Sequence, residues 1–140
     1  MIENRAAALP PMRIAARQGR ELFSVLRFIE EKISMPFVDV NGLRAIERLP
    51  GWSGRYFHSS NMTFAHYDFQ RGASIHEHFH PQEEVYEVTE GELEVTIDGV
   101  AQIVKPGLVA IVPGGARHSV KALTDGRAII VDYPMRPEFQ

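Results

Sequence analysis

The sequence predicts an all-β domain, a small barrel or sandwich, with one helix before it. From residue 37 onward, short β-type runs are separated by turn signals at intervals of roughly 8–12 residues. Residues 93–97 alternate apolar and polar side chains, as a strand with one buried face does. Asp98-Gly99 separates this run from residues 100–104, which is a strong signal for a two-residue hairpin.

Residues 15–34 predict the helix. Met35-Pro36 ends it, because the residue before a proline avoids the α-helical region. We therefore place a tail and helix in residues 1–36 and the barrel in residues 37–140. The apolar positions follow helical spacing and are Leu22, Val25, Leu26, Ile29 and Ile33.

The composition limits the classes of function. A chain of 140 residues, 44% hydrophobic and 24% charged, fits one globular domain with one core. A net charge of −3 gives no basic surface for nucleic acid. Apolar runs such as residues 128–131 are far shorter than the ~20 residues of a membrane span. We see no signal peptide and expect a cytoplasmic protein without nucleic-acid or membrane partners.

Histidines and a carboxylate gather in residues 72–91. His76, His78 and His80 occupy alternate positions, so in a regular strand they share one face. Pro81-Gln82 then turns the chain, and a hairpin can return Glu84 beside the histidines. The chain has no cysteine, so a metal ion would be held by imidazole and carboxylate groups. This set suits one divalent transition metal, which we expect to be Fe, Mn, Ni, Co or Zn.

A fourth ligand comes from a second segment. A predicted strand over residues 108–112 enters the turn Pro113-Gly114-Gly115, and His118 begins the next strand. In an antiparallel barrel, His118 can approach the same interior point from a neighbouring hairpin. We therefore predict a metal site made of His78, His80, Glu84 and His118.

These two segments resemble the motifs of the cupin superfamily, in particular its small single-domain bacterial members. The first motif, G-x5-H-x-H-x3-E-x6-G, runs from Gly72 to Gly91, and the second, G-x5-P-x-G-x2-H, runs from Gly107 to His118. The resemblance covers roughly residues 37–135. It implies a double-stranded β-helix (jelly-roll) barrel, a metal site of three histidines and one glutamate, and frequent homodimers. The asparagine that often follows the last histidine in this family is Ala122 here.

The resemblance implies no single reaction, and whether the site is catalytic at all stays open. We expect a small-molecule substrate inside the barrel. For the reaction we favour an oxygenase-like activity, of the dioxygenase type, on a small aromatic or dicarbonyl compound. The grounds are the reactions common in the family and an aromatic-rich interior, for which Phe64, Phe79 and Tyr86 are candidates. The sequence does not determine which face of the strand that carries Phe64 points inward. Glu84 is the expected proton acceptor, with His76 and Tyr86 as further candidate catalytic residues.

Two alternatives remain for the same metal ligands. One is a metal-dependent sugar or uronate isomerase, and the other is a module that binds a small ligand without turnover. The residues that line the cavity distinguish the oxygenase from the sugar or uronate isomerase. Polar and charged groups favour a sugar substrate, and apolar groups favour oxygenation of an aromatic compound.

Overall fold

The computed structural model describes residues 37–139, and those from 39 onward form one compact unit. The helix predicted for residues 15–34 and the tail before it lie outside the described residues. Within the described part, the only helical segments are two 3-10 turns, η1 (Val40–Gly42) and η2 (Pro137–Phe139). The rest of this part is strand and loop, so the all-β class is confirmed.

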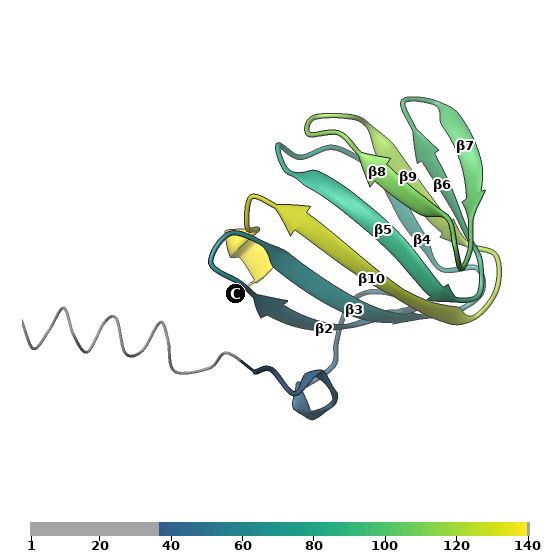
Figure 1. Cartoon of the computed structure of the whole chain (residues 1–140). Helices are drawn as coiled ribbons and strands as arrows, with labels where there is room; N and C mark the ends of the chain where they lie inside the picture. The colour runs from purple at the N-terminus through teal and green to yellow at the C-terminus, as the bar shows by residue number, and fades with distance from the viewer. Residues whose placement is uncertain (1–36, 140) are drawn as a thin grey trace, which may run out of the picture. The chain divides into compact units, whose positions relative to one another are not determined.

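Ten strands form two antiparallel sheets (Figure 1). The larger sheet has the order β1-β2-β3-β10-β5-β8, and the smaller has the order β4-β9-β6-β7. Consecutive strands often lie in different sheets, as in a jelly roll. The strands are β1 (Ile46–Leu49), β2 (Trp52–His58), β3 (Thr63–Phe69), β4 (Ser74–His78), β5 (Glu83–Glu90), β6 (Leu93–Ile97), β7 (Val100–Val104), β8 (Val109–Val112), β9 (His118–Ala122) and β10 (Gly126–Tyr133).

The core lies between the two sheets and follows the alternation along each strand. In β5, the side chains of Glu84, Tyr86 and Val88 are buried, while Glu83 and Glu87 are exposed. The same period of two on β6, β9 and β10 directs one residue in two toward the opposite sheet. The interior is therefore apolar along most of its length, with polar groups concentrated where the site lies.

The predicted hairpin between β6 and β7 is confirmed. Ile97 and Val100 are the last paired residues, and Asp98-Gly99 makes the turn. Both turn residues have positive φ, 47° for Asp98 and 81° for Gly99, as a type I′ turn requires. The turn thus fixes the register in which Leu93 and Val95 point into the core.

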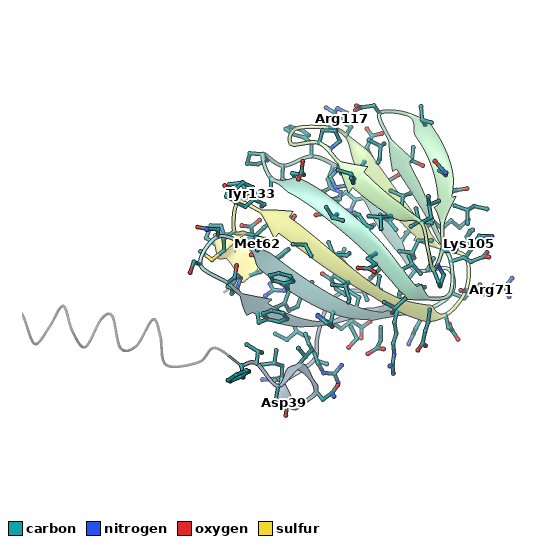
Figure 2. The ribbon with its side chains drawn as sticks, in the orientation of Figure 1. Asp39, Met62, Arg71, Lys105, Arg117 and Tyr133 are labelled. Carbon is teal, nitrogen blue, oxygen red and sulfur yellow. The ribbon has the colours of Figure 1, made fainter. Side chains whose placement is uncertain are left out.

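The two ends of the barrel differ. Figure 2 shows Met62 and Tyr133 at one end and Arg71 and Lys105 at the other. The first end holds the start of β3 and the finish of β10, which pair through Thr63 and Asp132. It also holds the C-terminal turn η2, so the last described residues lie beside this end (Figure 1).

The described residues contain no helix that is long and apolar enough to cross a membrane.

Candidate metal centre

The four predicted ligands lie at strand ends that converge inside the barrel. His78 is the last residue of β4, and His118 is the first residue of β9. The two are direct partners across these strands, and their ring centroids are 4.2 Å apart. His80 follows β4, and Glu84 lies at the start of β5 in the other sheet. The site therefore joins both sheets.

The distances between ligand atoms fit a shared ion. One ligand atom from each of His78, His80 and His118 lies within 4.8 Å of the others. The carboxylate of Glu84 contacts two of these rings: Oε2 is 3.0 Å from Nε2 of His80, and Oε1 is 3.6 Å from Nε2 of His118. The three imidazoles thus form a group that could hold a metal ion, and the carboxylate of Glu84 adjoins two of them, a donor set that suits a transition metal.

Two backbone carbonyls fix the orientation of the histidine rings. Nδ1 of His78 is 2.8 Å from the carbonyl oxygen of His76, and Nδ1 of His118 is 2.9 Å from that of Ala116. A carbonyl can only accept a hydrogen bond, so each Nδ1 carries the proton and donates it. Each Nε2 then keeps its lone pair for a metal, which is the usual arrangement around metal-binding histidines.

Buried atoms without hydrogen bonds mark the same point. Nε2 of His80, Nε2 of His118 and Oε1 of Glu84 are inaccessible to solvent and make no hydrogen bond within the described residues. Leaving a buried polar atom unsatisfied costs about 1–3 kcal/mol. A divalent ion bound by these atoms would remove that cost, so the residues present fit the metal that the fold family implies.

The charges of the ligands are coupled. Burial alone would raise the pKa of Glu84, but its contacts with His118 and His80 hold that pKa well below its usual value. Burial alone would lower the pKa of His118, but Glu84 and the carbonyl of Ala116 raise it above 6.5. Burial lowers the pKa of His78. Protons therefore compete with a metal ion at His118, because a metal binds the neutral imidazole.

A second buried carboxylate, Asp132, was not anticipated from the sequence. It lies on β10 directly opposite Glu84 and is only 2% exposed. Asp132, His80 and Glu84 form a second group that could hold a metal. Burial and the negative charge of Glu84 raise the pKa of Asp132 to about 8. Because two adjacent buried carboxylates resist double ionisation, the pair together holds one proton near neutral pH.

Arg136 is the cation of the site. Its Nη1 lies 3.6 Å from Oε2 of Glu84 and 3.7 Å from Oδ1 of Asp132. Its Nε lies 2.6 Å from Oε1 of Glu138, and its side chain is 14% exposed. The guanidinium thus reaches the carboxylates from the mouth of the barrel and is anchored from outside.

These groups line one cavity of about 230 Å³. His78, Glu84, Asp132 and Arg136 make its polar part, and Tyr67 and Tyr86 add hydroxyl groups. Tyr86 is 1% exposed, so its predicted inward orientation is confirmed. The complete lining comprises Leu49, Ala65, Tyr67, Ile75, His76, His78, Glu84, Tyr86, Ile130, Asp132, Arg136 and Phe139.

His76 does not share a regular strand face with His78. Ile75 pairs with Val120 and His78 pairs with His118, so β4 carries one extra residue between these pairs. Such a bulge resets the alternation of side chains. His76 is consequently exposed, at the rim of the cavity. Its role as a candidate catalytic residue stays a prediction.

Two of the three expected interior aromatic residues lie elsewhere. Phe64 stacks on Phe57 outside the barrel, because Ala65 and Tyr67 take the inward positions of β3. Phe79 is 60% exposed, and its ring lies 5.2 Å from the guanidinium of Arg117. Of the three candidates, Tyr86 is thus the interior aromatic, and Phe64 and Phe79 are not.

The motif glycines are turn residues, as predicted. Gly91, Gly107 and Gly115 all have positive φ. At Gly91 a side chain would also collide with the carbonyl oxygen of Asp125. This turn connects β5 to β6, so the glycine allows the ligand-bearing strand to pass into the smaller sheet.

Comparison with known proteins agrees with this geometry. The family model for the cupin domain matches residues 65–133, which include all four predicted ligands. No curated protein matches the chain in sequence. The fold and the cluster define a two-sheet barrel whose interior could bind a metal ion. The chain belongs to the cupin superfamily.

Several solved structures share the fold. An RmlC-like cupin from Shewanella frigidimarina is 24% identical, with a TM-score of 0.71 over 75% of this chain and 96% of that one. KdgF from Halomonas is 23% identical, with a TM-score of 0.69 over 74% and 96%. A predicted oxalate decarboxylase from Thermotoga maritima is 21% identical, with a TM-score of 0.61 over 70% and 98%. At these identities the likeness concerns the fold.

Proposed function

We propose that this protein is a metal-dependent enzyme that acts on a small carboxylate-bearing polar molecule, such as a sugar acid, by moving a proton. The observation that carries the proposal is the buried Asp132 next to the partly buried Arg136, beside the ligand cluster. The two residues provide a group that can hold a proton and a group that can bind an anion, and both line one cavity.

The groups nearest the ligands support this reading over oxygenation of an aromatic compound. They are ionisable or hydroxylic, whereas apolar groups such as Leu49, Ile75 and Ile130 make up most of the remaining lining. A volume of about 230 Å³ is below the ~300–1,000 Å³ of sites for drug-sized ligands. A small polar substrate fits both properties.

Arg136 would bind the carboxylate of the substrate. Nη1 stands 3.6 Å or more from both protein carboxylates, which is beyond a good hydrogen bond. A substrate carboxylate could accept from its free N–H groups, while Glu138 holds Nε in place. A bidentate contact of this kind also fixes the orientation of the substrate.

In its ionised form, which a cation bound at Glu84 would favour, Asp132 would accept a proton from one carbon of the substrate at Oδ1 and return it to another carbon. This oxygen makes no hydrogen bond within the described residues. A metal held by His78, His80, Glu84 and His118 would polarise a substrate oxygen and so make a neighbouring C–H bond more acidic. Tyr86, whose pKa burial and Glu84 raise well above its ordinary value, stays protonated and can donate a hydrogen bond. Moving a proton between carbons in this way is an isomerisation.

The test is a substrate panel on metal-loaded protein. Uronates and other sugar acids in D2O are followed by NMR, and O2 consumption is measured in parallel with diketones, catechols and flavonols. Deuterium incorporation or isomerisation of a sugar acid without O2 uptake is expected. Substrate-dependent O2 uptake with the aromatic or dicarbonyl compounds would instead support the oxygenase predicted first from the sequence.

A further inference from the structure

A second cavity lies on the outer face of the six-stranded sheet, opposite the face that bears the metal centre. On β3, His66 and Asp68 line this outer cavity, whereas Ala65 points inward and lines the cavity of the metal centre. The outer cavity has a volume of about 360 Å³, within the ~300–1,000 Å³ of sites for small ligands. It is therefore large enough for a small organic molecule, and the sheet separates it from the metal centre.

The outer cavity carries an excess of positive charge. Arg55 on β2 and Arg127 on β10 both contact Asp68, which lies on β3 between them. Nη1 of Arg55 is 3.4 Å from Oδ2 of Asp68, and Nε of Arg127 is 2.9 Å from Oδ1. Among the described residues that line the cavity, two guanidinium groups thus stand against one carboxylate. The carboxylate holds both cations beside the same space but neutralises only one of them.

Hydrogen-bond donors in the outer cavity have no partner within the described residues. Arg127 contacts Asp68 through Nε, so both of its Nη atoms are available to a ligand. The ring of His66 makes no hydrogen bond in the described part of the chain. Burial lowers the pKa of His66, so near neutral pH its uncharged ring has one N–H group to donate. Planar guanidinium groups with free Nη atoms suit the oxygen atoms of a carboxylate or phosphate.

The wall of the outer cavity that comes from η1 is tied to the sheet. Nε of Arg55 donates to the carbonyl oxygen of Leu43 at 3.1 Å, directly after η1. The side chain of Asp39 accepts from the backbone N–H of Asn41 at 3.1 Å and so caps the turn. Figure 2 shows this segment, labelled at Asp39, outside the sheet. Because these contacts shape the cavity before a ligand arrives, less ordering is needed on binding.

We propose that the outer cavity binds a small organic anion that carries a phosphate or carboxylate group. The Nη atoms of Arg127 would donate to two oxygens of that group, and the ring of His66 would add a third donor. Asp68 would hold the guanidinium groups in place and could accept from a hydroxyl group of the ligand. Ile129 provides an apolar surface for its carbon atoms. The proposal depends neither on the metal nor on the proposed reaction.

Isothermal titration calorimetry of the full chain tests the proposal, with glucose 6-phosphate and glucuronate as probes at low ionic strength. Saturable binding of at least one probe is expected, with a Kd below about 1 mM. Arg127→Gln should raise this Kd at least about 10-fold, because it removes the charged donor. Arg117→Gln is the matched control and should leave the Kd unchanged. Its side chain is 62% exposed, against 63% for Arg127, and each arginine pairs with one carboxylate.

The same titrations in an Arg136→Gln background separate the outer cavity from the metal centre. This variant removes the cation of the inner cavity, so binding that persists in it belongs to the outer one. In NMR spectra, the ring signals of His66 should shift when the bound probe is added. Binding of glucose 6-phosphate alone would identify a phosphate site, and binding of glucuronate alone a carboxylate site. The proposal would be overturned if neither probe bound, if Arg127→Gln left the Kd unchanged, or if Arg136→Gln abolished binding.

Discussion

Asp132 and Glu84 are direct cross-strand partners on β10 and β5, and their side chains are only 2% and 3% exposed. Two carboxylates in this position repel each other when both are ionised. Arg136 beside them offsets part of the repulsion, and a bound metal ion would offset more. The fold therefore places two mutually repelling carboxylates at the point where a cation is expected to bind.

Asp132→Asn should stabilise the metal-free protein at high pH. The pKa of Asp132 is about 8 in the folded protein and about 3.8 in the unfolded chain. Between these values the folded state binds more protons, so the contribution of Asp132 to stability falls as pH rises from about 4 to 8. An asparagine at this position does not ionise, so the variant does not lose stability in this way as pH rises. The Tm of the variant should therefore exceed that of the parent by more at pH 9 than at pH 5.

Thermal unfolding of the metal-free protein and Asp132→Asn at these two pH values measures the effect. Asp68→Asn, at a surface carboxylate, serves as the control for a general change of charge. A gain in Tm that is the same at both pH values would contradict the raised pKa. The same Asp132→Asn substitution should abolish proton transfer in the metal-loaded enzyme.

Metal affinity should increase with pH through the titration of His118. Its contact with Glu84 raises the pKa of the imidazole above 6.5, and the metal requires the neutral ring. Protons therefore compete with the metal most strongly below that pKa. Titration with Co²⁺ or Ni²⁺ between pH 5.5 and 8.5, followed by absorbance, should show a rising association constant. An affinity independent of pH over this range would show that His118 is not a ligand.

Arg136→Gln should weaken binding of a carboxylate ligand with a smaller effect on turnover. A hydrogen bond to a charged group contributes about 1.5–3 kcal/mol, so KM should rise roughly 10- to 150-fold. Arg117→Gln is the control, because the Arg117 side chain is 62% exposed and pairs with Glu77. The two variants should bind the amide analogue of the substrate equally well. If Arg136→Gln lost as much affinity for the amide analogue as for the carboxylate, Arg136 would not be the group that binds the carboxylate.

Phe139→Ala should lower the free energy of unfolding, because the ring packs at the mouth of the barrel. A position next to the last residue suggests little effect, but the ring lies 5.3 Å from that of Tyr56 and 4.5 Å from the guanidinium of Arg136. Because Phe139 is only partly buried, the expected loss is about 1–2 kcal/mol rather than the ~3–5 of a core phenylalanine.

Denaturant unfolding compares Phe139→Ala with Phe79→Ala, whose ring is 60% exposed and should matter little. Equal stability of the two variants would mean that η2 does not pack on the barrel. A loss in Phe139→Ala alone would support the contacts of the C-terminal turn.

Structural features that depend on residues close together in the chain could be predicted from the sequence. Spacing placed His78, His80 and Glu84 in one hairpin, and Asp98-Gly99 determined another hairpin through local backbone preference. These features depend on residues close in the chain. His118 meets His78 only through the pairing of β4 with β9, and its place in the site was expected from an antiparallel barrel and from the cupin resemblance.

Features that depend on distant strands could not be predicted. Asp132 meets Glu84 only through the pairing of β10 with β5. A signal was present, since Asp132 has the parity of the inward residues Ala128 and Ile130 in an otherwise apolar run. The bulge in β4 and the inward face of β3 depend on the partner strands. The orientations of His76 and Phe64 therefore could not be predicted from the local sequence pattern.

Elemental analysis of full-length protein, purified without an affinity tag, tests the central claim most directly. We predict about one transition-metal ion per chain in the parent protein and in His76→Ala, whose exposed ring is no ligand. His78→Ala and His118→Ala should retain less than about a tenth of that, since each removes one of four ligands. Equal metal content in all four proteins, or no metal after loading the parent, would contradict the site.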